Sequence, residues 1–324
     1  MNTIHGFFKI RKELGKKVLQ NEPMSEYTTL GLGGPARLLT VVKKEEELKK
    51  YIELAVKNDV LLLIIGEGSD LLVSDEGFDG FVIVNKVEGI KLIKDKVVVK
   101  SGTNLQKFIN FCIDKGFSGM EKMSGIPGTV GGAIYGNAGA YGQTASDYLI
   151  SVKSFDGKKL RLFTKKQCKF GYRESIFKKN REVILEAEFK FEKGVPEFLK
   201  KVSLDTITLR NQRYHTGSKC PGSFFKNVIV SELKLDILSK IPRDKIVFGK
   251  IPAGYLMEAV GAKGQQRGSV KIANDHGNLI INLGNGTAKD FMDLAFEFAK
   301  KVEKKFGIKL EPEVQLIGFK EHGS

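Results

Sequence analysis

The sequence predicts an α+β fold built from at least two units, and three observations support this prediction. Short apolar runs of strand length are interspersed with longer stretches in which apolar residues recur at helical spacing. The composition shifts after Gly194, where a basic segment of helical pattern begins. The chain has 324 residues, enough for two or three domains that each bury a core. We place the boundary between the units near residues 195–215.

The first half of the chain begins with a predicted short amphipathic helix over residues 1–20. A glycine cluster at 31–34 then leads into an apolar strand, and Leu48 and Ile52 lie at helical spacing beyond it. Gly116 stands where the end of a helix favours glycine. The expected helices are 43–58 and 104–116, and the expected strands are 38–42, 61–65, 71–73, 81–85, 90–93 and 96–100.

The chain from residue 149 onwards combines a β-hairpin with longer helices. The Asp156-Gly157 pair is a strong turn signal between apolar runs at 149–155 and 159–163. Thr287 and Asp290 resemble a capping box at the start of a long helix with an apolar stripe. The remaining expected helices are 195–212, 255–260 and 287–306, and the remaining strands are 182–191, 279–282 and 313–317.

The stretch from Gly119 to Gly142 reads GMEKMSGIPGTVGGAIYGNAGAYG and contains eight glycines. Glycine costs about 1 kcal/mol relative to alanine within a helix, so we expect no helix or strand of ordinary length here. A flexible linker is the alternative, but linkers are polar, whereas this segment carries Ile126, Ile134 and Tyr135. We therefore predict an ordered ligand loop whose backbone N–H groups lie open to a phosphate or a flat ring.

A second glycine turn, Gly66-Glu-Gly-Ser-Asp70, follows a predicted buried strand and leads directly into another strand. This geometry suits a nucleotide phosphate, although the helix that follows such a turn in a Rossmann unit is missing. A simple tight turn explains the pattern equally well by itself. At this point the sequence leaves both interpretations open.

The formal net charge of +15 raises the question of a nucleic-acid partner. The lysines are spread along the whole chain and alternate with glutamate, as in KKEEELKK at 43–50. That pattern is typical of a solvated surface, so we expect no nucleic-acid partner. A basic protein also concentrates small polyanions such as nucleotides, and that weaker inference remains.

Cysteine usage and hydropathy restrict the compartment and the chemistry. Cys112, Cys168 and Cys220 are scattered and form no CxxC motif, which argues against a disulfide framework and a metal site. No apolar run approaches the ~18 residues that a membrane span requires, so we expect no membrane association. The N-terminal residues lack an apolar core of signal-peptide length, which indicates a cytoplasmic protein.

Five motifs occur in a fixed order: GEGSDLLVSDEGFDGFVI at 66–83, SGIPGTVGGAIYGNAGAYG at 124–142, YRESIF at 172–177, GSFFKN at 222–227 and LEPEVQLIG at 310–318. Together they closely resemble bacterial UDP-N-acetylenolpyruvoylglucosamine reductase, the flavoenzyme that makes UDP-N-acetylmuramate for peptidoglycan. The similarity is to the variant that lacks a tyrosine-bearing insertion. It covers residues 20–318, nearly the whole chain.

The resemblance implies a two-part FAD-binding region of the vanillyl-alcohol-oxidase type followed by a C-terminal α+β substrate domain. It divides the chain into an N-terminal helix (1–20), the FAD-binding region (21–194, with two lobes split near 86–90), the substrate domain (195–320) and a tail (321–324). In such enzymes FAD carries the hydride, and the protein holds and tunes the cofactor.

By the same resemblance, the backbones of Gly66–Asp70 and Ile126–Gly132 hold the FAD pyrophosphate, and Gly136–Gly139 runs near the isoalloxazine. The predicted FAD-binding residues are Gly66, Glu67, Gly68, Ser69, Asp70, Leu71, Ile126, Pro127, Gly128, Thr129, Gly132, Asn137, Ala138 and Gly139. Asp70 stands where the family usually has asparagine, so its carboxylate should point away from the pyrophosphate or weaken FAD binding.

The residues that reduce the substrate are also implied by the motifs. Ser223 of GSFFKN matches the serine that supplies a proton to the enolpyruvyl group after hydride transfer. Serine is a weak acid, so it needs neighbours that stabilise the loss of its proton. Arg173 of YRES and Glu313 of EPEV match its partners, and an arginine offers a rigid donor fork to the substrate carboxylate. Taken singly, each would be an ordinary turn, surface or strand-edge residue.

Further substrate contacts are expected at Tyr172, Asn227 and Gln266. Arg210 either binds the diphosphate or is a surface arginine of a helix, and both interpretations stay open. The segment KGQQRGSVKIANDH at 263–276 departs from the family pattern KGxxIGGAxVSxxH. We therefore expect Arg267 and Ser269 to disturb a packed segment.

The resemblance implies a cytoplasmic, FAD-dependent reductase that uses NADPH to convert UDP-N-acetylglucosamine-enolpyruvate to UDP-N-acetylmuramate. A monomer is the family's usual state. One alternative is another FAD-dependent oxidase or dehydrogenase of the same fold, because fold alone does not fix chemistry. A second, of a different class, is a basic nucleic-acid-binding protein without flavin.

Overall fold

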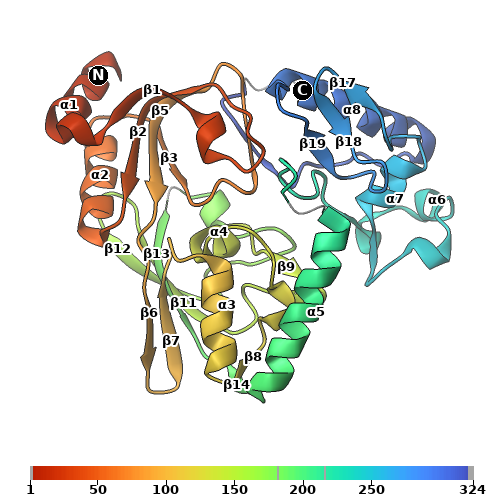
Figure 1. The fold of residues 1–324 in the computed structure, drawn as a ribbon, viewed down its shortest axis with the longest axis horizontal. Helices are drawn as coiled ribbons and strands as arrows, with labels where there is room; N and C mark the ends of the chain where they lie inside the picture. Colours follow the sequence, from red (N-terminus) through yellow and green to blue (C-terminus); the bar gives the residue numbers. More distant parts are fainter. Residues whose placement is uncertain (1–2, 181, 215–216, 320–324) are drawn as a thin grey trace. The chain divides into compact units, whose positions relative to one another are not determined.

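A computed structural model describes residues 3–180, 182–214 and 217–319 (Figure 1). Its chain forms two compact units: unit 1 comprises 1–22, 36–67 and 79–212, and unit 2 comprises 23–35, 68–78 and 213–324. Both units mix helices with short strands, which confirms the predicted α+β class. The tail expected at 321–324 lies outside the described residues.

The helices and strands have the following bounds. The helices are α1 (Thr3–Leu14), α2 (Glu45–Lys57), α3 (Leu105–Asp114), α4 (Val130–Tyr135), α5 (Pro196–Tyr214), α6 (Leu235–Leu238), α7 (Ala253–Glu258) and α8 (Ala288–Phe306). The strands up to residue 118 are β1 (Leu19–Pro23), β2 (Pro35–Val42), β3 (Leu62–Ile65), β4 (Leu71–Val73), β5 (Phe78–Asn85), β6 (Ile90–Ile93), β7 (Lys96–Lys100) and β8 (Phe117–Ser118). The later strands are β9 (Gly139–Ala140), β10 (Gln143–Thr144), β11 (Leu149–Phe155), β12 (Leu160–Thr164), β13 (Val183–Phe189), β14 (Glu192–Lys193), β15 (Val228–Ile229), β16 (Lys250–Ile251), β17 (Gln266–Arg267), β18 (Val270–Ile272), β19 (Ile280–Asn282) and β20 (Gln315–Ile317).

The first lobe of unit 1 is a four-stranded sheet in the order β1-β2-β5-β3. Helices α1 and α2 share one apolar core with this sheet, and Leu48 and Ile52 of α2 are buried in it, as their spacing predicted. Strands β3 and β5 pair in parallel, which requires the long connection between them.

The second lobe of unit 1 is a five-stranded sheet in the order β12-β11-β13-β7-β6, and α3 and α4 contribute to its core. The β11–β12 hairpin pairs Phe155 with Leu160, so the turn predicted at Asp156-Gly157 is confirmed. Phe189 and Phe191 stack in this core with ring centroids 5.6 Å apart.

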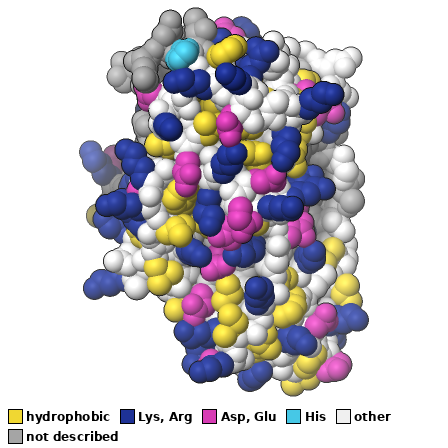
Figure 2. Space-filling view, turned by 90° about the vertical axis from the view of Figure 1, so that its left-hand side faces the viewer, with side chains coloured by type: hydrophobic (Ala, Val, Ile, Leu, Met, Phe, Trp, Pro, Cys, Tyr) yellow, Lys and Arg dark blue, Asp and Glu magenta, His cyan; other side chains and the backbone are white. Residues whose placement is uncertain are grey.

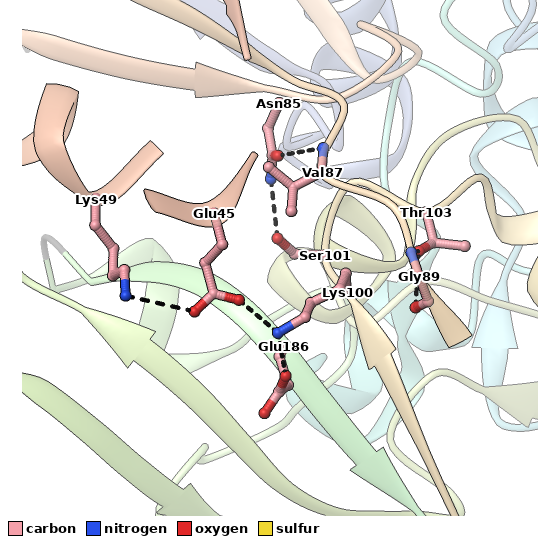
Figure 3. Close-up of polar contacts among 9 residues, drawn as sticks. All are labelled: Glu45, Lys49, Asn85, Val87, Gly89, Lys100, Ser101, Thr103 and Glu186. Atoms are coloured by element: carbon pink, nitrogen blue, oxygen red, sulfur yellow. Dashed lines mark hydrogen bonds and ion pairs between the residues drawn. The ribbon is translucent and has the colours of Figure 1, made fainter. Parts of the chain in front are cut away.

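Polar contacts join the two lobes where β5 ends (Figure 3). The Asn85 side chain donates to Ser101 Oγ at 2.9 Å and accepts from the Val87 amide at 3.0 Å. Next to it, Lys100 of β7 lies between the carboxylates of Glu45 on α2 and Glu186 on β13. One ammonium therefore binds carboxylates from both lobes.

Unit 2 is organised around α8, whose buried side chains pack in one core with strands β18 and β19. Thr287 caps α8 by accepting from the Asp290 amide, as predicted. Asp75 adds a second cap, because its two carboxylate oxygens accept from the Ala288 and Lys289 amides at 2.8 and 2.9 Å. These N–H groups have no partner within the helix, so the caps stabilise its start.

Three local expectations differ from the structure. The N-terminal helix ends at Leu14 because Gly15 takes φ +55°, and a 3-10 turn (Gly15–Lys17) followed by β1 occupies the residues after it. The glycine segment includes the six-residue helix α4. Arg267 disturbs no packed segment, because its side chain lies on the surface. Its Nη1 is 3.4 Å from Asp293 Oδ2, and its Nη2 is 3.2 Å from Glu297 Oε2. Within the described ranges, no helix is long and apolar enough to cross a membrane.

Candidate functional site

The glycine segment of unit 1 has a more satisfied backbone than the sequence predicted. Thr129 caps α4, its Oγ1 accepting from the Gly132 amide at 3.3 Å. The Val130 and Gly131 amides donate to the Thr103 and Ser101 carbonyls at 2.9 and 2.8 Å. The expectation of open amides is therefore wrong at these positions, because neighbouring turns of the same lobe supply the acceptors.

The glycines themselves give a better indication of a ligand. An added Cβ at Gly131 would lie 2.8 Å from Ser101 Cβ, so packing explains that glycine. At Gly132 and Gly136 the nearest atoms would be 3.6 and 3.7 Å away, and neither residue has a positive φ. Alanine would fit both positions and would favour a helix. A ligand that approaches the backbone closely accounts for glycine there.

The two glycine segments meet in unit 1 through Glu67. Its carboxylate accepts from the Gly128 amide at 3.0 Å and from Asn104 Nδ2 at 2.7 Å. A Cβ on Gly66 would lie 2.4 Å from Thr129 Oγ1, so only glycine permits this approach. The predicted FAD-binding residues Gly66, Glu67, Gly128 and Thr129 are thus neighbours.

The rest of the first turn belongs to unit 2. Gly68 takes φ +65°, and its carbonyl accepts from the Thr29 amide at 3.1 Å. A Cβ there would lie 2.0 Å from the Tyr27 carbonyl oxygen, so the turn requires glycine. The Asp70 carbonyl accepts from the Gln315 amide at 3.0 Å, and Leu71 begins β4.

Asn137 provides a direct test of whether the site fits a flavin. It has φ +42°, is 6% exposed and donates from Nδ2 to the Gly171 carbonyl at 2.8 Å. Among the described residues nothing hydrogen-bonds to its buried Oδ1. A buried acceptor of this kind is costly unless a ligand donates to it. The ring N–H of a flavin is such a donor, so Asn137, Gly132 and Gly136 fit the predicted cofactor.

Arg173 extends towards the same segment of unit 1. Its Nη2 donates to the Gly139 carbonyl at 2.8 Å, and its Nη1 lies 3.5 Å from the Asn137 carbonyl oxygen. The guanidinium carbon lies 5.2 Å from the ring centroid of Tyr172. The structure therefore brings predicted catalytic and substrate-binding side chains next to the stretch predicted to face the isoalloxazine.

Ser223 and Glu313 lie on adjacent segments of unit 2. The Glu313 amide donates to the Phe224 carbonyl at 2.7 Å, and the Phe224 amide donates to the Asn278 carbonyl at 3.0 Å. Phe224 is fully buried, and its ring lies 5.1 Å from that of Phe291. The buried phenylalanine thus fixes both Ser223, which precedes it, and Glu313, which is bonded to it.

The other predicted substrate residues occupy different surroundings. Asn227 accepts from the Ala253 amide at 3.1 Å, which places it beside the start of α7. Gln266 is exposed and donates to the Gly268 carbonyl of its own turn at 2.9 Å. The Arg210 side chain lies against Gly125, where an added Cβ would be 3.2 Å from Arg210 Cδ.

Arg213 and His276 of unit 2 form a pair that the sequence did not single out. Arg213 Nη2 lies 2.9 Å from His276 Nε2, and the Asn278 amide donates to His276 Nδ1 at 3.1 Å. A neutral imidazole has one acceptor nitrogen, so only one of these donors is satisfied. Burial, followed by the charge of Arg213, lowers the pKa of His276. When the Asn278 amide occupies the acceptor nitrogen Nδ1, the Nε2–H of His276 and the guanidinium of Arg213 are two donors that suit an anion.

A sequence signal for this pair did exist, because Arg213 closes a basic helix and His276 ends the segment 263–276. Neither Arg213 nor His276 alone indicates a binding site, and the two residues are far apart in the sequence. Only the folding of unit 2 shows that they meet.

Models of two protein families match separate parts of the chain. Residues 36–158 match the model of an FAD binding domain, and residues 212–317 match that of the UDP-N-acetylenolpyruvoylglucosamine reductase C-terminal domain. The predicted fold class and the predicted FAD cofactor are confirmed.

Similar proteins cover nearly the whole chain. The UDP-N-acetylenolpyruvoylglucosamine reductase of Solibacter usitatus is 38% identical, covering 93% of this chain and 97% of its own. The reductase of Bacillus subtilis is 35% identical, covering 95% of this chain and 96% of its own. The crystal structure of the reductase from Thermus caldophilus has a TM-score of 0.71 and 29% identity, covering 93% and 98%. This chain therefore belongs to the UDP-N-acetylenolpyruvoylglucosamine reductase family.

Proposed function

We propose that the chain reduces UDP-N-acetylglucosamine-enolpyruvate to UDP-N-acetylmuramate, using NADPH and FAD, in the synthesis of peptidoglycan precursors. The observation that carries this proposal is the pairing of Ser223 and Glu313 through Phe224, which sets a hydroxyl and a carboxylate on adjacent segments. Family membership supplies the reaction, and we assign FAD binding to residues 21–194 and substrate binding to 195–320.

When bound, FAD supplies the hydride, which it receives from NADPH. Ser223 would then hold the proton that goes to the substrate carbon next to the carboxylate. A serine hydroxyl gives up a proton readily only where its neighbours stabilise the resulting charge. We assign Glu313 to orient that hydroxyl and to move the proton at Ser223 Oγ.

Arg173 would neutralise the negative charge that develops on the enolpyruvyl group. The guanidinium is always protonated, so it acts by donating hydrogen bonds and not by titrating. Its anchorage on the Gly139 carbonyl fixes the group before the substrate arrives, and such preorganised donors are a large source of rate enhancement. We place Tyr172 and Asn227 at the substrate as well.

Cationic groups are available for the diphosphates of the ligands. Arg213 and His276 present two donors to an oxyanion in unit 2, and we propose that they bind a phosphate of the sugar nucleotide. Arg210 lies against Gly125 in unit 1, which favours contact with the FAD segment over the substrate role expected for it. Gln266 remains a predicted contact.

The remaining expectations concern partners and location. Figure 2 shows Lys and Arg side chains intermixed with Asp and Glu over one face, the pattern of a solvated surface. We therefore propose small-molecule partners in place of nucleic acid. A cytoplasmic monomer stays a prediction, which sedimentation and cell fractionation would check.

The test is a visible spectrum of the purified protein under anaerobic conditions. We expect NADPH to bleach the flavin absorption and the enolpyruvyl sugar nucleotide to restore it. A Ser223→Ala variant should bleach normally and fail to recover, because it lacks the proton donor. A bleached wild-type flavin that only oxygen restores would contradict the proposal and favour an oxidase of the same fold.

A further inference from the structure

Lys178 is bonded to the backbone of Arg173. Its Nζ donates to the Arg173 carbonyl oxygen at 2.8 Å and lies 3.9 Å from Glu174 Oε1. Only 12% of the Lys178 side chain is exposed, whereas most lysine ammonium groups extend into solvent. Burial of a charged group is unfavourable unless its bonds compensate, so this placement calls for an explanation.

The Arg173 backbone has a conformation that needs external support. Arg173 takes φ +57°, the left-handed region that disfavours residues with a Cβ. It lies at the tip of a tight turn closed by hydrogen bonds between Gly171 and Glu174, at 3.0 and 3.3 Å. A strained residue of this kind persists only where its surroundings fix it, and such residues cluster at functional sites.

The lysine itself stands on a rigid base. It ends a short 3-10 helix, Ile176–Lys178, whose Phe177 is 2% exposed and packs edge-on against Phe163 at 5.4 Å. Ser175, just before that helix, donates from Oγ to the Tyr135 carbonyl of α4 at 2.7 Å. The Lys178 backbone is thereby fixed to the same segment that receives the Arg173 guanidinium.

Arg173 is consequently held at both ends. The Gly139 carbonyl accepts from its guanidinium, and Lys178 fixes its main chain. We propose that Lys178 is a positioning residue, which sets the direction in which Arg173 presents its guanidinium to the substrate. This inference rests on the proposed function, because it takes Arg173 to act on the enolpyruvyl group.

The test compares the two half-reactions in Lys178→Met, which keeps an unbranched side chain as far as Cε and removes the ammonium. We expect reoxidation of the reduced flavin by the enolpyruvyl sugar nucleotide to slow about tenfold or more at saturating substrate, because a small misplacement of a catalytic group is costly. Flavin content and the rate of flavin reduction by NADPH should match the wild type, and the melting temperature should fall only by the loss of one hydrogen bond. Lys178→Arg, which still donates to the carbonyl, should recover most of the rate.

Lys179→Met is the matched control, since Lys179 is the exposed neighbour and the same charge is lost. A double variant that combines Lys178→Met with Arg173→Lys tests whether Lys178 affects the reoxidation rate through Arg173. If Lys178 acts through Arg173, Lys178→Met should cause little further slowing in that background.

Several results would overturn the inference. These are an unchanged reoxidation rate, equal slowing of both half-reactions, loss of flavin, and full additivity with Arg173→Lys. Failure of the wild-type flavin to reoxidise with the sugar nucleotide would overturn the proposed function instead. The wild-type protein alone gives this result, so the two failures are distinguished before any variant is measured.

Discussion

The amide of Glu313 donates a 2.7 Å hydrogen bond to the carbonyl of Phe224, so the EPEV and GSFFKN motifs are directly joined in unit 2. On the other side, Phe225 is bonded twice to Asn278. The Phe225 amide donates to Asn278 Oδ1 at 2.9 Å, and Asn278 Nδ2 donates to the Phe225 carbonyl at 2.8 Å. The segment that carries Ser223 is thus hydrogen-bonded on both sides, to the segment of Glu313 and to Asn278.

Asn278→Ala should destabilise unit 2 strongly, because Asn278 is 1% exposed and both Phe225 backbone groups would lose their side-chain partner. We expect the free energy of unfolding to fall by about 2–4 kcal/mol. Urea unfolding measures this loss. Asn110→Ala, at an exposed site of α3, is the control, and equal effects of both variants would contradict the role of Asn278.

Gly132→Ala and Gly136→Ala should separate cofactor binding from folding. Neither added methyl group meets protein atoms closer than 3.6 Å, so the flavin-free protein should melt no lower than the wild type. The dissociation constant for FAD, from fluorescence titration of flavin-free protein, should rise about tenfold or more, equivalent to about 1.4 kcal/mol.

The matched control for these variants is Gly131→Ala. Its Cβ would lie 2.8 Å from Ser101 Cβ, so it should lower the melting temperature itself. Unchanged FAD affinity in both Gly132→Ala and Gly136→Ala would mean that no cofactor approaches α4.

His276 should make stability depend on pH. Burial lowers the pKa of His276 from its usual 6.5, so the folded chain keeps this ring neutral after the unfolded chain has begun to bind a proton. The free energy of unfolding should therefore decrease as the pH falls below about 6.5, by about 1 kcal/mol per unit within the window.

Urea unfolding at pH 7.5 and 5.5 checks this sign. His276→Gln should reduce the loss of stability between these values, whereas His5→Gln, on the exposed side of α1, should leave it unchanged. The assignment is refuted if the wild type loses less free energy of unfolding between pH 7.5 and pH 5.5 than the His276→Gln variant does.

Lys100→Met should leave Glu45 and Glu186 without their shared cation (Figure 3). The side chains are 15–25% exposed, so we expect a loss of about 2–3 kcal/mol, less than for a fully buried pair. Lys49→Met is the control, because Lys49 lies 3.8 Å from Glu45 in an i,i+4 pair worth about 0.5 kcal/mol or less.

The same cluster has a pH signature. Burial acts to raise the pKa of Glu45, but the hydrogen bond and charge of Lys100 outweigh it and hold that pKa below the usual 4.5. The stabilisation is present above pH 4.5 and is lost as the pH falls through the lowered pKa. The stability difference between wild type and Lys100→Met should therefore be smaller at pH 3.5 than at pH 7.

Local chemistry made part of the fold predictable. The Asp156-Gly157 turn and the Thr287 cap depend on residues within a few positions, so the sequence alone indicated both. Helix α4 was missed because two of its six residues are glycine, and intrinsic propensity disfavours it. Its formation depends on Thr103 and Ser101 carbonyls that lie elsewhere in the chain.

The candidate site was predictable only through motifs that resemble a family. Ser223, Arg173 and Glu313 are ordinary residues when taken singly, and no periodicity distinguishes them. The bonds of Lys178 to Arg173 and of Asn278 to Phe225 join backbone groups to side chains, which no pattern of residue types specifies.

The parallel pairing of β4 with β20 has a consequence for how the protein is made. Leu71 pairs with Gln315, so the first of these strands leaves the ribosome about 240 residues before its partner. At typical synthesis rates of 5–20 residues per second, β4 waits for about 10–50 seconds with an unpaired edge. During that interval this edge of β4 is open to pairing with other segments, and unit 1, which ends at residue 212, is complete before β20 is made.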